Sequence, residues 1–271
     1  MKKNYLKFVA VLSLLVFLFL QSLYATGGKL PAYAKHGMVT SSSIIASEVG
    51  RDVLKSGGNA VDAAVATALT LAVTWPSAGN IGGGGFMIYY SHDGKATAFD
   101  FREKAPLAAF EKMYLTPDGK IRNNSNHDGI LAVGVPGTVA GLYLAHQKLG
   151  RKPWKELVAP AIKLAGKGFP YTWALHRAVT SYYAKIFKKY PSTAKKMLKK
   201  SGQVYEPGEI WRQPDLAKTL KRIQKYGRDG FYKGETARKL ADFMKKNGGL
   251  ITGEDLAKYQ AVERKPVHGT Y

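Results

Sequence analysis

The sequence contains no cysteine and comparatively few acidic residues. The first absence excludes disulfides, thiolate nucleophiles and Cys-ligated zinc from this chain. The second leaves 41 Lys and Arg against 19 Asp and Glu, a formal net charge of +22. Such a balance is typical of proteins that meet nucleic acid, anionic membranes or acidic substrates. With 271 residues, 45% of them hydrophobic, the chain can build one large domain or two small ones.

Several short motifs that would indicate a metal site, a serine nucleophile or a phosphate-binding loop are also missing. The six histidines form no His-x-x-x-His pair, so we expect no metal site and no cofactor. There is no Gly-x-Ser-x-Gly elbow for a hydrolase serine. Residues 80–90 read NIGGGGFMIYY, and such a glycine run could form a phosphate-binding loop. No Lys follows the glycines, however, and the segment after them is a predicted strand, whereas a phosphate-binding loop is followed by a helix. Close backbone packing or a left-handed turn remain as reasons for this glycine run.

The N-terminus has the pattern of a secretory signal peptide. A basic start, MKKNYLK, precedes an apolar run at residues 8–20, and Leu23 and Ala25 suit a signal peptidase. We therefore predict a signal peptide over 1–25 and an exported chain over 26–271, periplasmic or extracellular. An uncleaved anchor helix is the alternative, although the run is shorter than the roughly 18–20 residues that a membrane span needs.

The pattern of apolar residues predicts a layered α/β fold. Ser43 and Asn59 can each cap a helix, and Trp75-Pro76 ends the second one. Residues 86–91 and 96–101 predict a hairpin with an Asp-Gly turn, and apolar side chains on both of its faces predict a central position. Further strands are expected at 38–42 and from about 265, and further helices at 138–149, 153–165, 216–226, 235–246 and after Thr252.

Residues 185–200, KIFKKYPSTAKKMLKK, are dense in lysine. Their spacing is nearly helical, which is typical of the solvated face of a surface helix. The alternative is a surface that binds nucleic acid or another polyanion, although the sequence has no known nucleic-acid motif.

The charged cluster at residues 100–106, DFREKAP, follows the second strand of the hairpin. Arg102 lies where this strand ends, so rigid backbone can hold its planar guanidinium ready for a carboxylate. The alternative is an ordinary charged turn in which Arg102 pairs with Glu103 or Asp100.

Seven segments, in this order, resemble the γ-glutamyltranspeptidase family. They are residues 37–73, 79–90, 99–106, 133–142, 214–220, 230–234 and 247–259. The resemblance covers essentially all of 26–271. It implies an N-terminal-nucleophile hydrolase fold, an αββα sandwich, made by a precursor that cuts itself into a large and a small subunit.

The resemblance also implies an activity. The new N-terminal Thr of the small subunit is the nucleophile, and its own amine is the base. It attacks the γ-glutamyl amide of glutathione or a related donor, and the acyl group passes to water or to an acceptor amino acid or peptide. The Arg of the FREKAP-type motif binds the α-carboxylate of the donor, a role that falls on Arg102.

The family's Thr-Thr-His-type motif does not occur in this sequence, and Thr138, Thr252 and Thr270 lie in other contexts. We therefore expect no catalytic residue in this chain, with the nucleophile beyond Tyr271 and the small subunit as a missing partner. The sandwich should then be incomplete, and the chain alone should be inactive.

Two other functions remain open. Relatives of this architecture include cephalosporin and glutaryl acylases and poly-γ-glutamate enzymes, although Arg102 favours a donor with a free α-carboxylate. A basic, exported binding protein without catalysis is the other alternative. Nucleic acid is not an expected partner.

Overall fold

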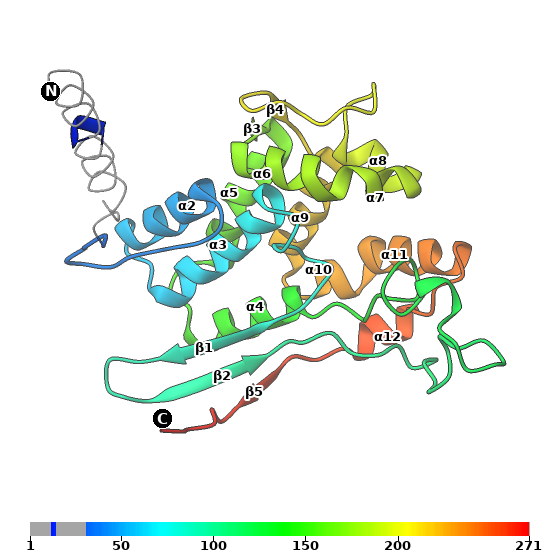
Figure 1. Ribbon diagram of the computed structural model, residues 1–271. Coiled ribbons are helices and arrows are strands. Elements are labelled where there is room, and N and C mark those ends of the chain that lie inside the picture. Colours follow the sequence, from blue (N-terminus) through cyan, green and yellow to red (C-terminus); the bar gives the residue numbers. More distant parts are fainter. Residues whose placement is uncertain (1–11, 15–30, 271) are drawn as a thin grey trace, which may run out of the picture. The chain divides into compact units, whose positions relative to one another are not determined.

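The computed structural model describes residues 12–14 and 31–270, and its chain divides into two units, Met1–Gly37 and Met38–Tyr271. The second unit carries the fold (Figure 1). Across the described ranges, no helix combines the length and apolar character needed to cross a membrane. The predicted signal peptide lies outside the described residues, except for 12–14, and stays a prediction.

Two adjacent helices begin where the sequence predicts them. Helix α2 spans Ile44–Lys55 after Ser43, and α3 spans Ala60–Thr74 after Asn59. Helix α3 is apolar around most of its circumference, with Val65, Ala66 and Leu69 fully buried. Because it has almost no polar face, α3 forms the centre of the helical layer.

A buried carboxylate fixes the start of α3. Asp62 is fully buried and completes a capping box with Asn59, accepting a hydrogen bond from the Asn59 N–H at 2.9 Å. It also accepts from the backbone N–H groups of Arg151, at 3.0 and 3.2 Å, and Lys152, at 3.2 Å. These bonds compensate the desolvation of the charge and join α3 to the turn between α4 (Thr138–Leu149) and α5 (Trp154–Lys167).

The main sheet has three antiparallel strands in the order β1-β2-β5. Strands β1 (Phe86–Tyr90) and β2 (Ala96–Asp100) form the predicted hairpin, and β5 is Val262–Arg264. Two strand predictions were wrong: residues 38–42 form no strand, and the last strand lies at 262–264, not from 265. The sheet pairs β5 with β2, a contact that local sequence pattern does not contain.

Only one face of this hairpin is covered in the described part of the chain. Phe99 is fully buried and Phe86, Ile88 and Tyr90 are 62%, 75% and 70% exposed. Helix α4 (Thr138–Leu149) lies along the covered face, between the sheet and the other helices (Figure 1). The mixed helix-and-sheet architecture confirms the α/β prediction, whereas burial of the hairpin on both faces is not seen.

The other helices pack around α3 and α4. They are α5 (Trp154–Lys167), α9 (Pro214–Tyr226), α10 (Asp229–Tyr232), α11 (Gly234–Lys246) and α12 (Gly253–Lys258). The indole of Trp154 donates to the carbonyl of Ile223 at 2.9 Å, which ties α5 to α9. A short 3-10 turn, η1 (Arg122–Asn124), lies in the loop before α4.

The lysine-rich segment does not form a single helix. Helix α6 (Trp173–Ala178), the π turn η2 (Val179–Tyr183) and α7 (Ala184–Lys189) run continuously, and α8 (Pro191–Met197) follows a break. Pro191 explains the break, because the residue before a proline is driven out of the helical conformation. The short strands β3 (Phe169–Pro170) and β4 (Ile210–Trp211) pair with each other before and after this segment.

Removing the Asp62 carboxylate should destabilise the protein strongly. Asp62→Ala removes half of the capping box and leaves three partly buried backbone N–H groups without their acceptor, so we expect a loss of about 3 kcal/mol. Thermal or urea unfolding measures this loss. Asp242→Ala, which removes a side chain that is 65% exposed, is the matched control and should leave Tm almost unchanged. Equal stability of the two variants would contradict this account.

Candidate functional site

Arg102 follows β2 by two residues, and its side chain is 70% exposed. Its Nε lies 3.1 Å from Oε2 of Glu103, so the charged-turn pairing considered above is present. An exposed ion pair of this kind contributes little to stability. The guanidinium therefore remains available to a ligand that offers a better carboxylate geometry.

The backbone beneath this side chain is held firmly. The Arg102 N–H donates to Oδ1 of Asp100 at 3.1 Å, and its carbonyl accepts from the Tyr259 hydroxyl at 2.8 Å. The N–H of Arg102, followed by the guanidinium of Arg264 at 2.7 Å, holds the pKa of Asp100 below its usual value. Asp100 is thus occupied by other donors and does not pair with the Arg102 guanidinium.

Tyr259 connects this backbone to the centre of the unit. It is 3% exposed and stacks on Tyr232, with ring centroids 5.6 Å apart and planes 11° from parallel. The Tyr232 hydroxyl in turn donates to the carbonyl of Pro136 at 2.7 Å. Burial, helped by the nearby carboxylates of Asp100 and Glu103, raises the pKa of Tyr259 to about 12. Its hydroxyl therefore remains a neutral donor at physiological pH.

The glycine run of residues 82–85 packs against the same backbone. The carbonyl of Gly83 accepts from the N–H groups of Gly137, at 2.7 Å, and Thr138, at 3.0 Å, at the start of α4. A Cβ on Gly84 would lie 2.4 Å from the carbonyl oxygen of Phe101. None of the four glycines has a positive φ, so close packing is confirmed and the left-handed turn was wrong.

Asp255 fixes the loop that leaves the Arg102 cluster. It is 5% exposed, forms the capping box of α12 with Thr252, and accepts from the Leu107 N–H at 2.6 Å. Burial of Asp255 opposes ionisation, but hydrogen bonds from Thr252 and Leu107 outweigh it and lower the pKa. The charged carboxylate thus joins α12 to the segment just after Arg102.

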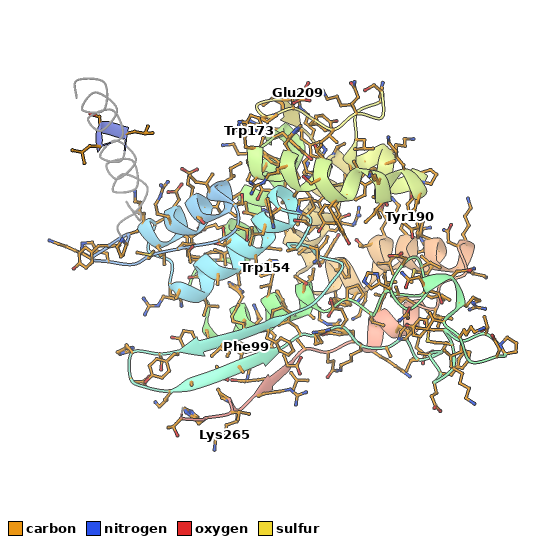
Figure 2. The ribbon with its side chains drawn as sticks, viewed as in Figure 1. Phe99, Trp154, Trp173, Tyr190, Glu209 and Lys265 are labelled. Atoms are coloured by element: carbon orange, nitrogen blue, oxygen red, sulfur yellow. The ribbon has the colours of Figure 1, made fainter. Side chains whose placement is uncertain are left out.

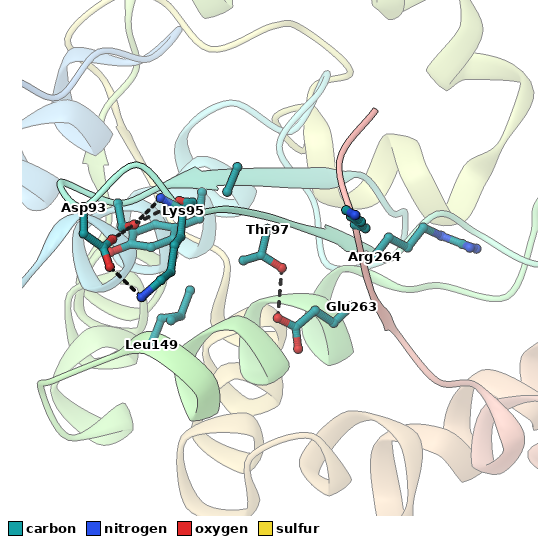
Figure 3. Close-up of a pocket in the computed structure, with 10 residues that line it drawn as sticks. Asp93, Lys95, Thr97, Leu149, Glu263 and Arg264 are labelled. Carbon is teal, nitrogen blue, oxygen red and sulfur yellow. Dashed lines mark hydrogen bonds and ion pairs between the residues drawn. The ribbon is translucent and has the colours of Figure 1, made fainter. Parts of the chain in front are cut away.

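A pocket of about 710 Å³ opens beside β2 and β5, toward the hairpin turn (Figure 3). Several of its charged groups already have partners: Lys95 pairs with Asp93 at 2.8 Å, and Glu263 accepts from Thr97 at 2.9 Å. Arg102 does not line it. We therefore centre the candidate site on Arg102 and not on this pocket.

Two of the threonines weighed in the sequence have structural positions: the Thr252 hydroxyl bonds to Asp255, and Thr138 is buried in the first turn of α4. Among the described residues, no three His, Cys, Asp or Glu side chains cluster as a metal site would require. The arrangement can bind and orient a carboxylate. Tyr259 is the supporting residue that sequence reasoning missed, although it lies in the quoted segment 247–259.

The model of the family described as Gamma-glutamyltranspeptidase matches residues 46–271. The chain belongs to this family. A glutathione hydrolase proenzyme from Pseudomonas sp. (strain A14) is 50% identical over 242 residues, which are 89% of this chain and 42% of that protein. The chain therefore spans about two fifths of the length of this relative.

Solved structures agree with this membership. The γ-glutamyltranspeptidase of Helicobacter pylori matches with a TM-score of 0.86 and 46% identity, over 89% of this chain and 69% of that one. The Pseudomonas nitroreducens enzyme, complexed with L-DON, matches at 0.80 and 47%, over 86% and 68%. A cephalosporin acylase from Bacillus halodurans, at 0.76 and 27% over 91% and 47%, has a similar fold.

Adding a methyl group at Gly84 should disturb the site, whereas the same change at Gly82 should not. Gly84→Ala forces a backbone shift at Phe101, so we expect a loss of about 1–3 kcal/mol in unfolding free energy. A Cβ on Gly82 meets nothing within 4 Å, so Gly82→Ala should be neutral or slightly stabilising. Chemical denaturation of both variants decides the matter, and a fully stable Gly84→Ala protein would refute close packing.

The Asp255 contact should depend on pH in a defined direction. Because the folded-state pKa is lowered, the stabilisation is complete above the ordinary value near 3.8 and disappears as the pH falls through the lower folded value. Asp255→Asn should cost about 1.5–3 kcal/mol at pH 6 and progressively less below about pH 4. Unfolding curves between pH 3 and 8 measure this difference, and a gap that widens in acid would contradict it.

Proposed function

We propose that this chain supplies the donor-binding part of a γ-glutamyl acyl-transfer enzyme, with Arg102 binding the α-carboxylate of the γ-glutamyl group. The donor is glutathione or a related γ-glutamyl compound, and the acceptor is water or an amino acid or peptide. The observation that carries the proposal is an exposed guanidinium on a backbone fixed by Tyr259 and Asp100.

The chemistry of the site supports this assignment. A guanidinium offers parallel N–H donors in a plane, which match the two oxygens of a carboxylate. A donor carboxylate would displace Glu103 from Arg102 and gain a second hydrogen bond. The names of the relatives, glutathione hydrolase proenzymes, and the L-DON complex of the Pseudomonas nitroreducens enzyme point to the same class of compound.

The nucleophile belongs, in this proposal, to the remainder of the family architecture. The family resemblance supplies a Thr whose amine acts as base, and the name proenzyme fits a precursor that is processed into two subunits. Arg102 then contributes by orientation, because a donor held by its α-carboxylate presents its γ-amide at a fixed distance from the clamp.

We also propose that the chain works in the periplasm or outside the cell after removal of residues 1–25. The basic start and the apolar run at residues 8–20 support this location. Sequencing the N-terminus of the exported protein tests it.

Replacing Arg102 should impair donor binding selectively. In a longer protein that joins this chain to its nucleophile, Arg102→Ala should raise KM for glutathione about 10–100-fold, because a charge-assisted pair is lost. Arg102→Lys should recover part of the loss. Arg238→Ala, which removes an exposed arginine on α11 that pairs with Asp242, is the control and should leave KM unchanged.

A butyryl anilide, which keeps the acyl chain of the γ-glutamyl group but has neither its α-carboxylate nor its α-amino group, isolates the carboxylate contact of Arg102. Arg102→Ala should leave its hydrolysis unchanged. An unaltered KM for glutathione in Arg102→Ala would overturn the proposal and favour an acylase.

A further inference from the structure

The chain concentrates unpaired positive charge on one excursion, which we call the basic arm: residues 173–200, comprising α6, η2, α7 and α8. No acidic residue occurs between Glu156 and Glu206, whereas this stretch contains ten Lys and Arg. Within the arm, Lys196 pairs with Asp215 and Lys199 with Glu209. The other six cations have no carboxylate within 4.0 Å among the residues described: Arg177, Lys185, Lys188, Lys189, Lys195 and Lys200.

The π turn keeps three of these cations, Arg177, Lys185 and Lys189, on one face. Exposed residues recur every four positions along the arm: Trp173, Arg177, Ser181, Lys185 and Lys189. In a regular helix of 3.6 residues per turn, a four-residue spacing drifts by about 40° at each step. The wider π turn η2, at residues 179–183, falls in the middle of the series and reduces this drift. Arg177, Lys185 and Lys189 therefore lie along one exposed face of the continuous stretch formed by α6, η2 and α7.

Aromatic side chains share this exposed surface. Trp173 is 74% exposed and Tyr182 is 61% exposed, while Leu175 and Val179 on the inner side are buried in the core. Trp173 lies at the start of the arm and Tyr190 near the far end of α7 (Figure 2). Trp and Tyr beside Lys and Arg are the residues that settle at the boundary between lipid headgroups and water.

We propose that the outer face of the basic arm docks on the surface of a bilayer rich in anionic phospholipids. The lysines approach the lipid phosphates and carboxylates, and Trp173 enters the headgroup layer. The exposed outer face of the arm suits a broad, flat surface. Single-stranded nucleic acids are instead bound in protein grooves, and duplexes are bound by protein elements that enter the grooves of the duplex. Figure 1 shows the arm and the sheet β1-β2-β5 at opposite sides of the helical layer, and Arg102 follows β2 by two residues. Docking therefore leaves Arg102 accessible, and this inference does not depend on the proposed function.

The size of the effect makes it measurable. Each Lys or Arg near an anionic leaflet strengthens binding by about fivefold at physiological ionic strength. The attraction falls away within a Debye length of about 8–10 Å, so it should weaken sharply in salt.

The test is co-sedimentation of the full chain with vesicles of phosphatidylcholine and phosphatidylserine, 7:3, or of phosphatidylcholine alone. The test variant carries Lys185→Glu, Lys188→Glu, Lys189→Glu and Lys195→Glu. The matched control carries Lys55→Glu, Lys112→Glu, Lys155→Glu and Lys265→Glu, four exposed lysines outside the arm. Both variants have the same net charge and keep the apolar run at residues 8–20. Any contribution of that run to vesicle binding is therefore the same in both variants. Circular dichroism checks that both fold.

The arm variant should bind the anionic vesicles at least tenfold more weakly than the parent chain, and the control less than threefold more weakly. Brominated lipid should quench Trp173 in the parent, a signal that Trp173→Phe abolishes. Equal losses in both charge variants would mean that net charge alone drives binding, and would overturn the proposal. So would equal binding by all three chains, or displacement from the vesicles by duplex DNA at an equivalent charge concentration.

Discussion

The close contact between the glycine backbone and the Phe101–Arg102 peptide is the constraint on which the candidate site depends. A side chain at Gly84 would clash with the Phe101 carbonyl, and one at Gly137 would lie 2.0 Å from the same oxygen. These two glycines come from the strand entry and from the start of α4. Their approach brings the sheet and the helical layer together at the point where β2 ends. The glycine run is thus a packing device and not a phosphate loop.

This packing separates the roles of backbone and side chain at Arg102. The backbone is bonded on one side to Asp100 and on the other to Tyr259, which is itself stacked on the buried Tyr232. The guanidinium projects from this fixed base into solvent. Because the backbone is already fixed, only the side chain of Arg102 would have to be ordered on meeting a ligand, which favours affinity and orientation together.

Local signals explain why much of the fold could be predicted. The caps at Asn59 and Thr252 and the Asp-Gly turn act within a few residues, so the sequence predicts α3, α12 and the hairpin correctly. The errors involve partners distant in sequence. Strand β5 exists because it pairs with β2, some 160 residues earlier, and residues 38–42 have strand character without such pairing. The hydrogen bond from Tyr259 to the Arg102 carbonyl joins residues that are similarly far apart in the sequence, and no sequence periodicity predicts it.

The Arg102–Glu103 pair is consistent with both an ordinary charged turn and a ligand clamp, and energetics separate the two. An exposed pair of this type is worth about 0–1 kcal/mol, so breaking it costs little. A bidentate contact with a carboxylate contributes about 1.5–3 kcal/mol. Asp100, the other nearby acid, is held by the Arg102 N–H and by Arg264 and does not compete. Under the proposed function, Glu103 is therefore an exchangeable partner that a donor's α-carboxylate would replace at a net gain.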